Sequence, residues 1–242
     1  YTYDQFGNIT SVSQNGAVVE SYEYDGLNQL IKVTNGANVT EYAYDAGGNL
    51  TSVKLNGEVQ DTYGYTDAGW KDLLTSFNGQ AITYDEIGNP LTYRDGFAFT
   101  WQNGRRLATA SRGSDSISYT YDPDGIRTSK TVNGTTTKYH VMNGTLLGQT
   151  KGSDTIVFLY DEKGNKYGFD YNGTKYYYIF NVQGDVIGIL NQSGSQIVSY
   201  TYDAWGKVLS VDGSEASTIG QINPIRYRGY YYDTETGFYY LQ

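Results

Sequence analysis

The sequence predicts an all-β fold, a continuous antiparallel meander of hairpins that curls into a spiralling shell. Three observations support this prediction: one short unit recurs along most of the 242 residues, pairs of aromatic residues stand two positions apart, and turn motifs follow at regular intervals. A spacing of two places both rings on one face of a strand, whereas the three- and four-residue spacing of long helices is missing. More than about ten neighbouring strands seldom remain flat, so we expect the sheet to curl.

The first strand of each unit is defined by its aromatic pair. Aromatic residues favour strands, and the hydroxyl of a buried tyrosine can still reach a polar partner. Tyr is accordingly abundant, with 27 copies. The pairs are Tyr22/Tyr24, Tyr42/Tyr44, Tyr63/Tyr65, Phe99/Trp101, Tyr119/Tyr121, Phe158/Tyr160 and Tyr200/Tyr202.

An Asp-initiated turn follows each aromatic strand, as in "DQFGN", "DAGGN", "DEIGN" and "DEKGN". Asp accepts hydrogen bonds from the backbone two residues on, and Gly supplies a positive φ. The second strand then reads "NITSV" or "NLTSV". Its first apolar residue and the Val three positions later cannot share a face in a regular strand, which predicts a β-bulge or a change of face.

A second turn, usually Asn-Gly, closes each unit. Asn-Gly between two strand-like segments is the strongest local signal for a hairpin. The predicted hairpin turns are Asn15-Gly16, Asn35-Gly36, Asn56-Gly57, Asn78-Gly79, Asn133-Gly134, Asn143-Gly144 and Asn172-Gly173.

Composition disfavours several classes of function. The net charge of −9 disfavours nucleic-acid binding, and we expect the small basic clusters Arg105-Arg106 and Arg226/Arg228 to be solvated or locally paired. The absence of cysteine excludes disulfides and thiolate chemistry. No apolar segment is long enough to span a membrane. Because the sequence begins within a repeat and without Met, we expect it to be part of a longer polypeptide.

The repeat resembles the YD repeat of Rhs proteins, teneurins and the C components of toxin complexes. The resemblance is carried by the Tyr-x-Tyr-Asp, turn-Gly-Asn and Leu-Thr-Ser-Val pattern. Two C-terminal segments, Tyr176–Val211 and Asn223–Gln242, resemble the start of the Rhs-associated core domain. We therefore expect YD repeats over residues 1–175 and the N-terminal part of the core domain over residues 176–242.

The resemblance implies a hollow β-shell that encloses a C-terminal toxin or effector domain of the parent chain. It also implies a bacterial protein that is secreted or displayed at the cell surface. In the family the core domain often releases the toxin by aspartyl autoproteolysis, but the catalytic aspartates belong to segments that follow "YYLQ". No catalytic residue is therefore assigned to this chain, and Asp233 in "YYYDTETG" is interpreted as a structural turn residue.

Other chemistry has little support in the sequence. His140 is the single histidine, and its place in the strand-like "KYHVMNG" favours a structural role over a catalytic or metal-binding one. The paired carboxylates lie at repeat turns, where turn geometry explains them, and a calcium site in "DEKGN" is the less favoured alternative. No nucleotide-binding motif is present, so we expect no metal, no cofactor and no enzymatic activity.

Two functions remain. The first is a non-catalytic segment of a toxin-enclosing shell. The second is an adhesin module that binds carbohydrate or a cell surface through exposed aromatic residues, for which Trp205 in "DAWGK" and Trp70 in "DAGWKD" are the candidates. We also expect open strand edges near Tyr1 and Tyr240 to favour self-association.

Overall fold

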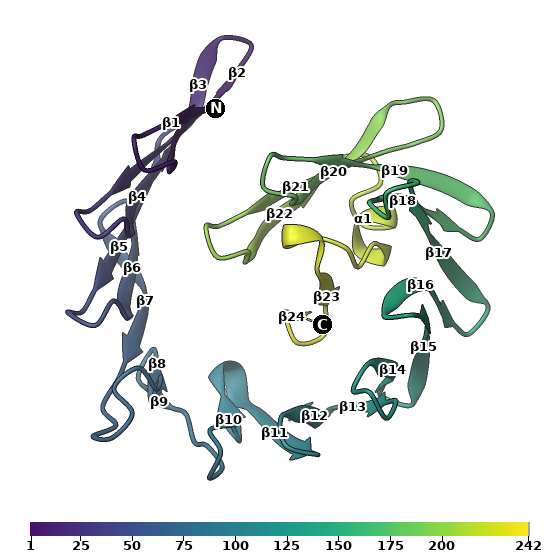
Figure 1. Ribbon diagram of the computed structural model, residues 1–242, viewed down its shortest axis with the longest axis horizontal. Helices are drawn as coiled ribbons and strands as arrows, with labels where there is room; N and C mark the ends of the chain where they lie inside the picture. The colour runs from purple at the N-terminus through teal and green to yellow at the C-terminus, as the bar shows by residue number, and fades with distance from the viewer. Residues whose placement is uncertain (242) are drawn as a thin grey trace. The chain divides into compact units, whose positions relative to one another are not determined.

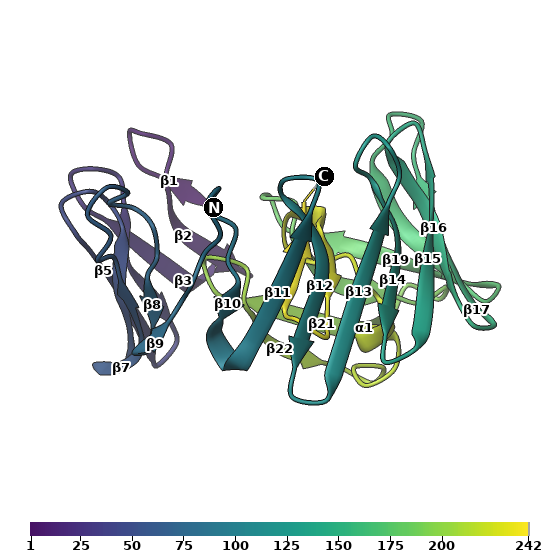
Figure 2. The same cartoon turned by 90° about the horizontal axis from the view of Figure 1, so that it is seen from below.

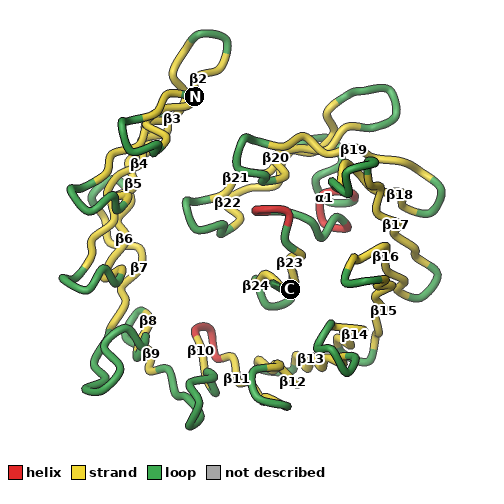
Figure 3. Tube along the Cα trace, viewed as in Figure 1, coloured by secondary structure: helices red, strands yellow, loops and turns green. Residues whose placement is uncertain are grey.

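The computed structural model describes residues 1–241, which form two compact units divided at Thr100/Trp101. Strands within each unit follow one another in sequence order and pair antiparallel with their neighbours. Figure 3 shows strands joined by turns, with few helical segments. A membrane-crossing helix is absent from residues 1–241, because every helix there has four residues or fewer.

The first unit contains a nine-stranded sheet, β1 to β9, followed by β10 and a single 3-10 turn. The bounds are β1 Thr2–Tyr3, β2 Ile9–Gln14, β3 Ala17–Tyr24, β4 Leu30–Asn35, β5 Asn38–Tyr44, β6 Leu50–Leu55, β7 Glu58–Gly64, β8 Ser76–Phe77, β9 Gln80–Ala81, β10 Thr92–Tyr93 and η1 Arg94–Gly96.

Strand β11 contains the boundary and pairs with β10, so that the second sheet runs from β10 to β22. The bounds are β11 Phe97–Gln102, β12 Arg106–Arg112, β13 Asp115–Tyr121, β14 Arg127–Val132, β15 Thr135–Met142, β16 Thr145–Lys151, β17 Asp154–Tyr160, β18 Lys166–Tyr171, β19 Thr174–Phe180, β20 Val186–Leu190, β21 Gln196–Tyr202, β22 Val208–Asp212, α1 Ile219–Ile222, η2 Tyr227–Gly229, β23 Tyr231–Asp233 and β24 Phe238–Tyr240. Figure 2 shows β12 to β16 side by side in the second unit.

The Asp turn of the repeat is built by the carboxylate. Asp161 Oδ1 accepts hydrogen bonds from the backbone N–H groups of Lys163 and Asn165 at 2.9 and 2.8 Å, while Oδ2 accepts from Asn165 Nδ2 at 2.8 Å. Gly164 adopts φ +82°, as the turn requires. These bonds lower the pKa of Asp161, with the Asn165 side chain as the largest cause. Turns at Asp4 and Asp45 repeat this arrangement.

The predicted β-bulge is confirmed at the start of the second strand. Glu23 pairs with Lys32 but Tyr24 pairs with Leu30, so Ile31 is the extra residue. The same offset occurs at Tyr44, Tyr121, Tyr160, Phe180 and Tyr202. The bulge shifts the alternation by one residue and thereby brings the first and fourth residues of the second strand onto one face.

The two tyrosines of the unit have different environments on the same face. The first is buried in several units, as in Tyr42, Tyr119 and Tyr200, while the residue between the pair is exposed. The second donates a hydrogen bond from its hydroxyl to a carbonyl at or near the start of the second strand of an earlier unit. The bonds are Tyr24 to Ile9, Tyr44 to Leu30, Tyr84 to Leu74, Tyr121 to Leu107, Tyr160 to Leu146 and Tyr202 to Val186, at 2.5–2.9 Å.

Six of the seven predicted Asn-Gly turns have positive φ at both residues, as a two-residue hairpin loop of type I′ requires. Asn35-Gly36 is the exception. Asn35 still pairs with Asn38, so the loop is Gly36-Ala37, and Gly36 has φ +58°. A loop whose first residue alone has positive φ belongs to type II′, which requires Gly there, and the prediction was therefore wrong by one residue.

Regular pairing is interrupted between β9 and β10, where an isolated Tyr84–Pro90 bridge replaces a strand pair. Pro90 lacks the backbone N–H that a ladder needs, and this shortens the second strand of that unit to Thr92–Tyr93. The meander is otherwise as predicted.

The C-terminal end of the long sheet differs from expectation. Its last strand is β22, and the following chain folds back over the sheet, so that Tyr240 belongs to the separate β23–β24 hairpin. Figure 1 shows this C-terminal segment, in yellow, inside the curve formed by β12 to β22. The core lies between them and includes the fully buried Phe169, Ile189, Val198 and Ile225.

Candidate functional site

The candidate site lies in the second unit, where residues 223–241 contact the concave, aromatic face of the sheet. Asn223 is completely buried and fixes the start of this segment. Its Oδ1 accepts a hydrogen bond from the Tyr178 hydroxyl at 2.8 Å, and its Nδ2 donates to the Ile225 carbonyl at 2.7 Å. Burial raises the pKa of Tyr178 well above its ordinary value, so this hydroxyl keeps its proton and donates.

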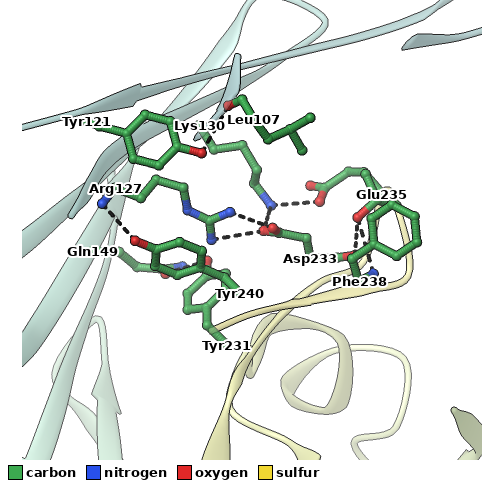
Figure 4. A network of polar contacts seen from close by, with 11 residues as sticks. Leu107, Tyr121, Arg127, Lys130, Gln149, Tyr231, Asp233, Glu235, Phe238 and Tyr240 are labelled. Atoms are coloured by element: carbon green, nitrogen blue, oxygen red, sulfur yellow. Dashed lines mark hydrogen bonds and ion pairs between the residues drawn. The ribbon is translucent and has the colours of Figure 1, made fainter. Parts of the chain in front are cut away.

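A buried ion cluster joins the β23–β24 hairpin to β14 (Figure 4). Asp233 accepts hydrogen bonds from Arg127 Nη1 and Nη2 at 2.6 and 3.2 Å, and from Lys130 Nζ at 2.8 Å. Lys130 Nζ also contacts Glu235 at 2.7 Å. The Arg127, Lys130 and Asp233 side chains are only 4–6% exposed. Two cations thus face two carboxylates, and the local charge is balanced.

Electrostatics keep both cations charged despite burial. Burial opposes the charge of Arg127, but the combined effect of Asp233, Tyr139 and Tyr231 outweighs it and raises the arginine pKa. Burial likewise opposes the charge of Lys130, and the combined field of Asp233, Tyr139 and Glu235 raises its pKa. Because removing one partner would leave a buried charge without compensation, the cluster ties the hairpin firmly to the sheet.

Aromatic rings surround the Arg127 guanidinium. Its central carbon lies 4.2 Å from the centroid of Tyr240, 4.9 Å from Tyr139, 5.2 Å from Tyr231 and 5.4 Å from Tyr119. Such cation–π contacts are worth about 2 kcal/mol or more when desolvated. The backbone N–H of Arg127 also donates to the Tyr240 hydroxyl at 2.9 Å. Rings from the sheet and the C-terminal hairpin therefore share one cation.

Arg226 corrects an expectation. It is 2% exposed rather than solvated, donates to the Gly220 carbonyl at 3.1 Å, and lies 4.5 Å from the Tyr232 ring. The reason is that the chain folds back over the sheet, which the local sequence does not reveal. Arg228 is partly exposed and lies 3.6 Å from Asp185, so it is locally paired as expected.

A cavity of about 260 Å³ adjoins the cluster. Its wall includes Arg127, Tyr139, Leu146, Tyr160, Lys166 and Ile225. Exposed Gly144, Thr145 and Tyr230 also line it and form its rim toward solvent.

The charged residues of this region interrupt the apolar pattern of the repeat. Arg127 and Lys166 occupy the first position of the second strand, where other units carry Leu30 or Leu50. Lys130 takes the fourth position, which is Val53 in an earlier unit. This substitution of charge for an apolar residue is a signal that the sequence contained and that our sequence analysis missed.

The carbohydrate candidates are both partly exposed. Trp205, in the second unit, is 49% exposed, and its Asp203 turn is held by Tyr227 and Tyr239, whose hydroxyls donate to the Ala204 and Gly206 carbonyls at 3.0 and 2.8 Å. Trp70, in the first unit, is 44% exposed and packs on Gly88. Sugar binding by either residue stays a prediction.

His140 lies on an exposed strand position, with Nε2 3.3 Å from Thr150 Oγ1. Within residues 1–241, no three His, Cys, Asp or Glu side chains come close enough to hold a metal ion. Asp233 accepts bonds from two cations in a buried anchor, which fits the structural role expected for it.

Curated proteins of Bacillus are similar in sequence to this chain. The chain is 37% identical over 227 residues to the tRNA3(Ser)-specific nuclease WapA of Bacillus spizizenii, and 44% identical over 227 residues to the tRNA(Glu)-specific nuclease WapA of Bacillus subtilis subsp. natto. Each match covers 90% of this chain but only 10% of the relative. The chain therefore corresponds to about a tenth of these curated proteins.

Solved toxin-complex structures share the fold. A Photorhabdus luminescens Tc holotoxin pore with mutated TccC3 matches with a TM-score of 0.71 and 18% identity, covering 99% of this chain and 14% of the other. A TcdB2-TccC3-TEV structure matches with a TM-score of 0.74 and 19% identity, covering 99% and 15%. The Teneurin YD-shell family model matches residues 1–242. The chain thus belongs to the Teneurin YD-shell family, as its repeats led us to expect.

Proposed function

We propose that this chain is a non-catalytic wall segment of a YD shell that encloses a C-terminal toxin or effector domain of its parent protein. The observation that carries the proposal is the buried Arg127–Lys130–Asp233 anchor, which holds the last described hairpin against the concave face of the sheet. Because the hairpin is held at this face, we expect the polypeptide that continues from it to run along the inner surface of the shell rather than away from it. Since the Bacillus relatives are named as tRNA nucleases, a nuclease is the class of enzyme that we expect for the enclosed domain.

The shell role follows from how the repeat distributes its side chains. Aromatic pairs line the packed face, while hydroxyl residues such as Thr120, Thr201 and Ser210 lie on the exposed one and hydrogen-bond to their cross-strand neighbours. The residues that recur from unit to unit are those that pack rings, pair strands and close turns. Architecture therefore explains the recurring residues better than catalysis does. We expect the parent to be secreted or displayed at the bacterial surface.

Protease protection tests the proposal. In the full-length parent protein, we expect the domain downstream of this chain to resist trypsin far longer than the same domain expressed alone. Asp233→Asn in the parent should shorten that protection, whereas the exposed-pair control Glu23→Gln should not. Mass spectrometry follows the digestion. Equal rates of digestion for the domain in the parent protein and for the domain expressed alone would contradict enclosure.

Carbohydrate binding is the second candidate, because Trp205 presents about half of its surface to solvent on a rigidly held turn. Aromatic surfaces of this kind can stack on sugar rings. A glycan array with the parent protein and Trp205→Ala tests it, with Trp70→Ala as the second site. Lack of glycan binding by the parent removes this candidate.

We also expect the isolated chain to self-associate, because β1 and β22 are end strands of their sheets. End strands carry unpaired backbone groups that can template pairing with another copy. Light scattering should show mass increasing with concentration, and a constant monomer mass would contradict the idea.

A further inference from the structure

The cavity beside the ion cluster contains a cation that nothing in the fold neutralises. Lys166 lines it and forms no ion pair with any residue of the part of the chain that the structure describes, 1–241. Its Nζ lies 4.7 Å from the Phe158 ring centroid and 5.7 Å from that of Tyr160. Arg127 and Lys130 have carboxylate partners in the same region, so Lys166 is the local excess of positive charge.

Hydrogen-bonding capacity is also unused around this cavity. Arg127 Nε is buried and has no hydrogen-bond partner within residues 1–241, while the buried Tyr139 hydroxyl interacts with that of Tyr231. Arg127 and Tyr139 both line the cavity, and their overall exposure is 4% and 8%. Buried polar atoms are normally satisfied, so an unsatisfied donor in the wall of a cavity that Lys166 also lines indicates a ligand rather than packing alone.

The shape of the cavity restricts the ligand. A cavity of about 150 Å³ accepts a benzene ring, so 260 Å³ has room for a ring with a small polar group. Tyr160, Tyr231, Leu146 and Ile225 supply aromatic and aliphatic wall, while Lys166 supplies the charge. The combination of an apolar wall and a few polar groups is typical of small-ligand sites.

We propose that this cavity is a carboxylate-binding site, in which the Lys166 ammonium pairs with the carboxylate and the tyrosine and aliphatic side chains cover the apolar part of the ligand. The carboxylate can come from a free aromatic acid or from an acidic side chain of a polypeptide in the interior. The proposal is independent of toxin enclosure, because it concerns the isolated chain.

Protonation gives the site a distinctive signature. Burial lowers the pKa of Lys166 to about 8, and no carboxylate counteracts this shift. A bound carboxylate favours the charged amine and raises that pKa. Binding between pH 8 and 9 should therefore take up a proton, and affinity should fall about tenfold per pH unit above pH 8, until the pKa of the complex is reached.

The experiment is calorimetric titration of the chain with phenylacetate and, in parallel, with the neutral isostere phenylacetamide. We expect saturable phenylacetate binding and at least tenfold weaker phenylacetamide binding, since a charge-assisted hydrogen bond contributes about 10- to 100-fold. Repeating the titration at pH 8.5 in two buffers of different ionisation enthalpy measures the proton uptake. A second arm, acetyl-Gly-Glu-Gly-amide against its Gln analogue, identifies a polypeptide source.

Lys166→Gln should weaken phenylacetate binding by the same 10- to 100-fold, whereas Lys175→Gln, at an exposed position of the next strand, should leave it unchanged. A measurement on the unsubstituted chain guards against misfolding: after reductive ¹³C-methylation, the Lys166 amine signal should titrate near pH 8 and shift to higher pH with phenylacetate. Absence of saturable binding by both carboxylates, equal binding of acid and amide, or no response of the Lys166 signal overturns the proposal.

Discussion

Replacement of Asp233 by Asn should cost the second unit more stability than removal of any exposed ion pair. The carboxylate accepts three bonds, at 2.6, 3.2 and 2.8 Å, from two cations whose side chains are about 5% exposed. Asn keeps the size of the side chain but not its charge, so two buried cations lose their main partner. Removing one partner of such a buried pair costs about 3–5 kcal/mol.

The matched control is Glu23→Gln. Its partner Lys32 is equally close, at 2.8 Å, but the two side chains are 35% and 57% exposed. Solvent screens this pair, and we expect a loss below about 1 kcal/mol. The comparison therefore separates burial from distance.

Chemical unfolding followed by far-ultraviolet circular dichroism measures both variants. A second substitution, Lys130→Met, added to Asp233→Asn should recover part of the loss, because it removes one uncompensated cation and leaves an apolar side chain. A loss for Asp233→Asn no larger than that for Glu23→Gln, or a further loss in the double variant, would refute the assignment of Asp233 as a buried anchor.

Three further predictions concern single residues. Lys166→Met should raise the free energy of unfolding by roughly 3 kcal/mol at pH 7, because the folded-state pKa of about 8 lies below the ordinary 10.5. Between pH 8 and 10.5 the Lys166 amine is protonated in the unfolded chain but not in the folded one, so the stability of the unsubstituted protein rises through this window. The difference in unfolding free energy between the variant and the unsubstituted protein should therefore disappear by about pH 10.5, and a pH-independent difference contradicts this. Tyr121→Phe, which removes the 2.9 Å bond to the Leu107 carbonyl, should cost about 1 kcal/mol in urea unfolding, whereas exposed Tyr167→Phe should cost nothing. Gly206→Ala should lower the melting temperature more than Gly194→Ala, because both have positive φ but only Gly206 has the Tyr227 ring where a Cβ would lie; equal shifts would rule out this clash.

Features that depend on short-range chemistry could be predicted from the sequence. The Asp161 turn, the bulge after it and the Asn172-Gly173 loop each need only a few neighbouring residues, and all three form as expected. Repetition made these predictions stronger, because the same turn and strand residues recur in successive units. The Gly36-Ala37 loop shows the limit: pairing of Asn35 with Asn38 fixes the register, and the dipeptide alone does not.

The candidate site depends on contacts between distant residues and was not predicted. Asp233 contacts Arg127 across 106 positions of sequence, and the chain must fold back after β22 before the two can meet. What the sequence did contain was a break in pattern, with Arg127, Lys130 and Lys166 at positions that other units fill with apolar residues. A charge on the packed face of a repeat requires a partner, and for Arg127 and Lys130 this reasoning could have pointed to the C-terminal acidic residues.

An electron cryomicroscopy reconstruction of the full-length parent protein would show whether the shell encloses the downstream domain. We expect residues 223–241 to contact the concave face through the Asp233 anchor, and density for the downstream domain to contact that same face. A reconstruction in which the hairpin is detached from the sheet, or in which the downstream domain is a separate body outside it, would refute enclosure.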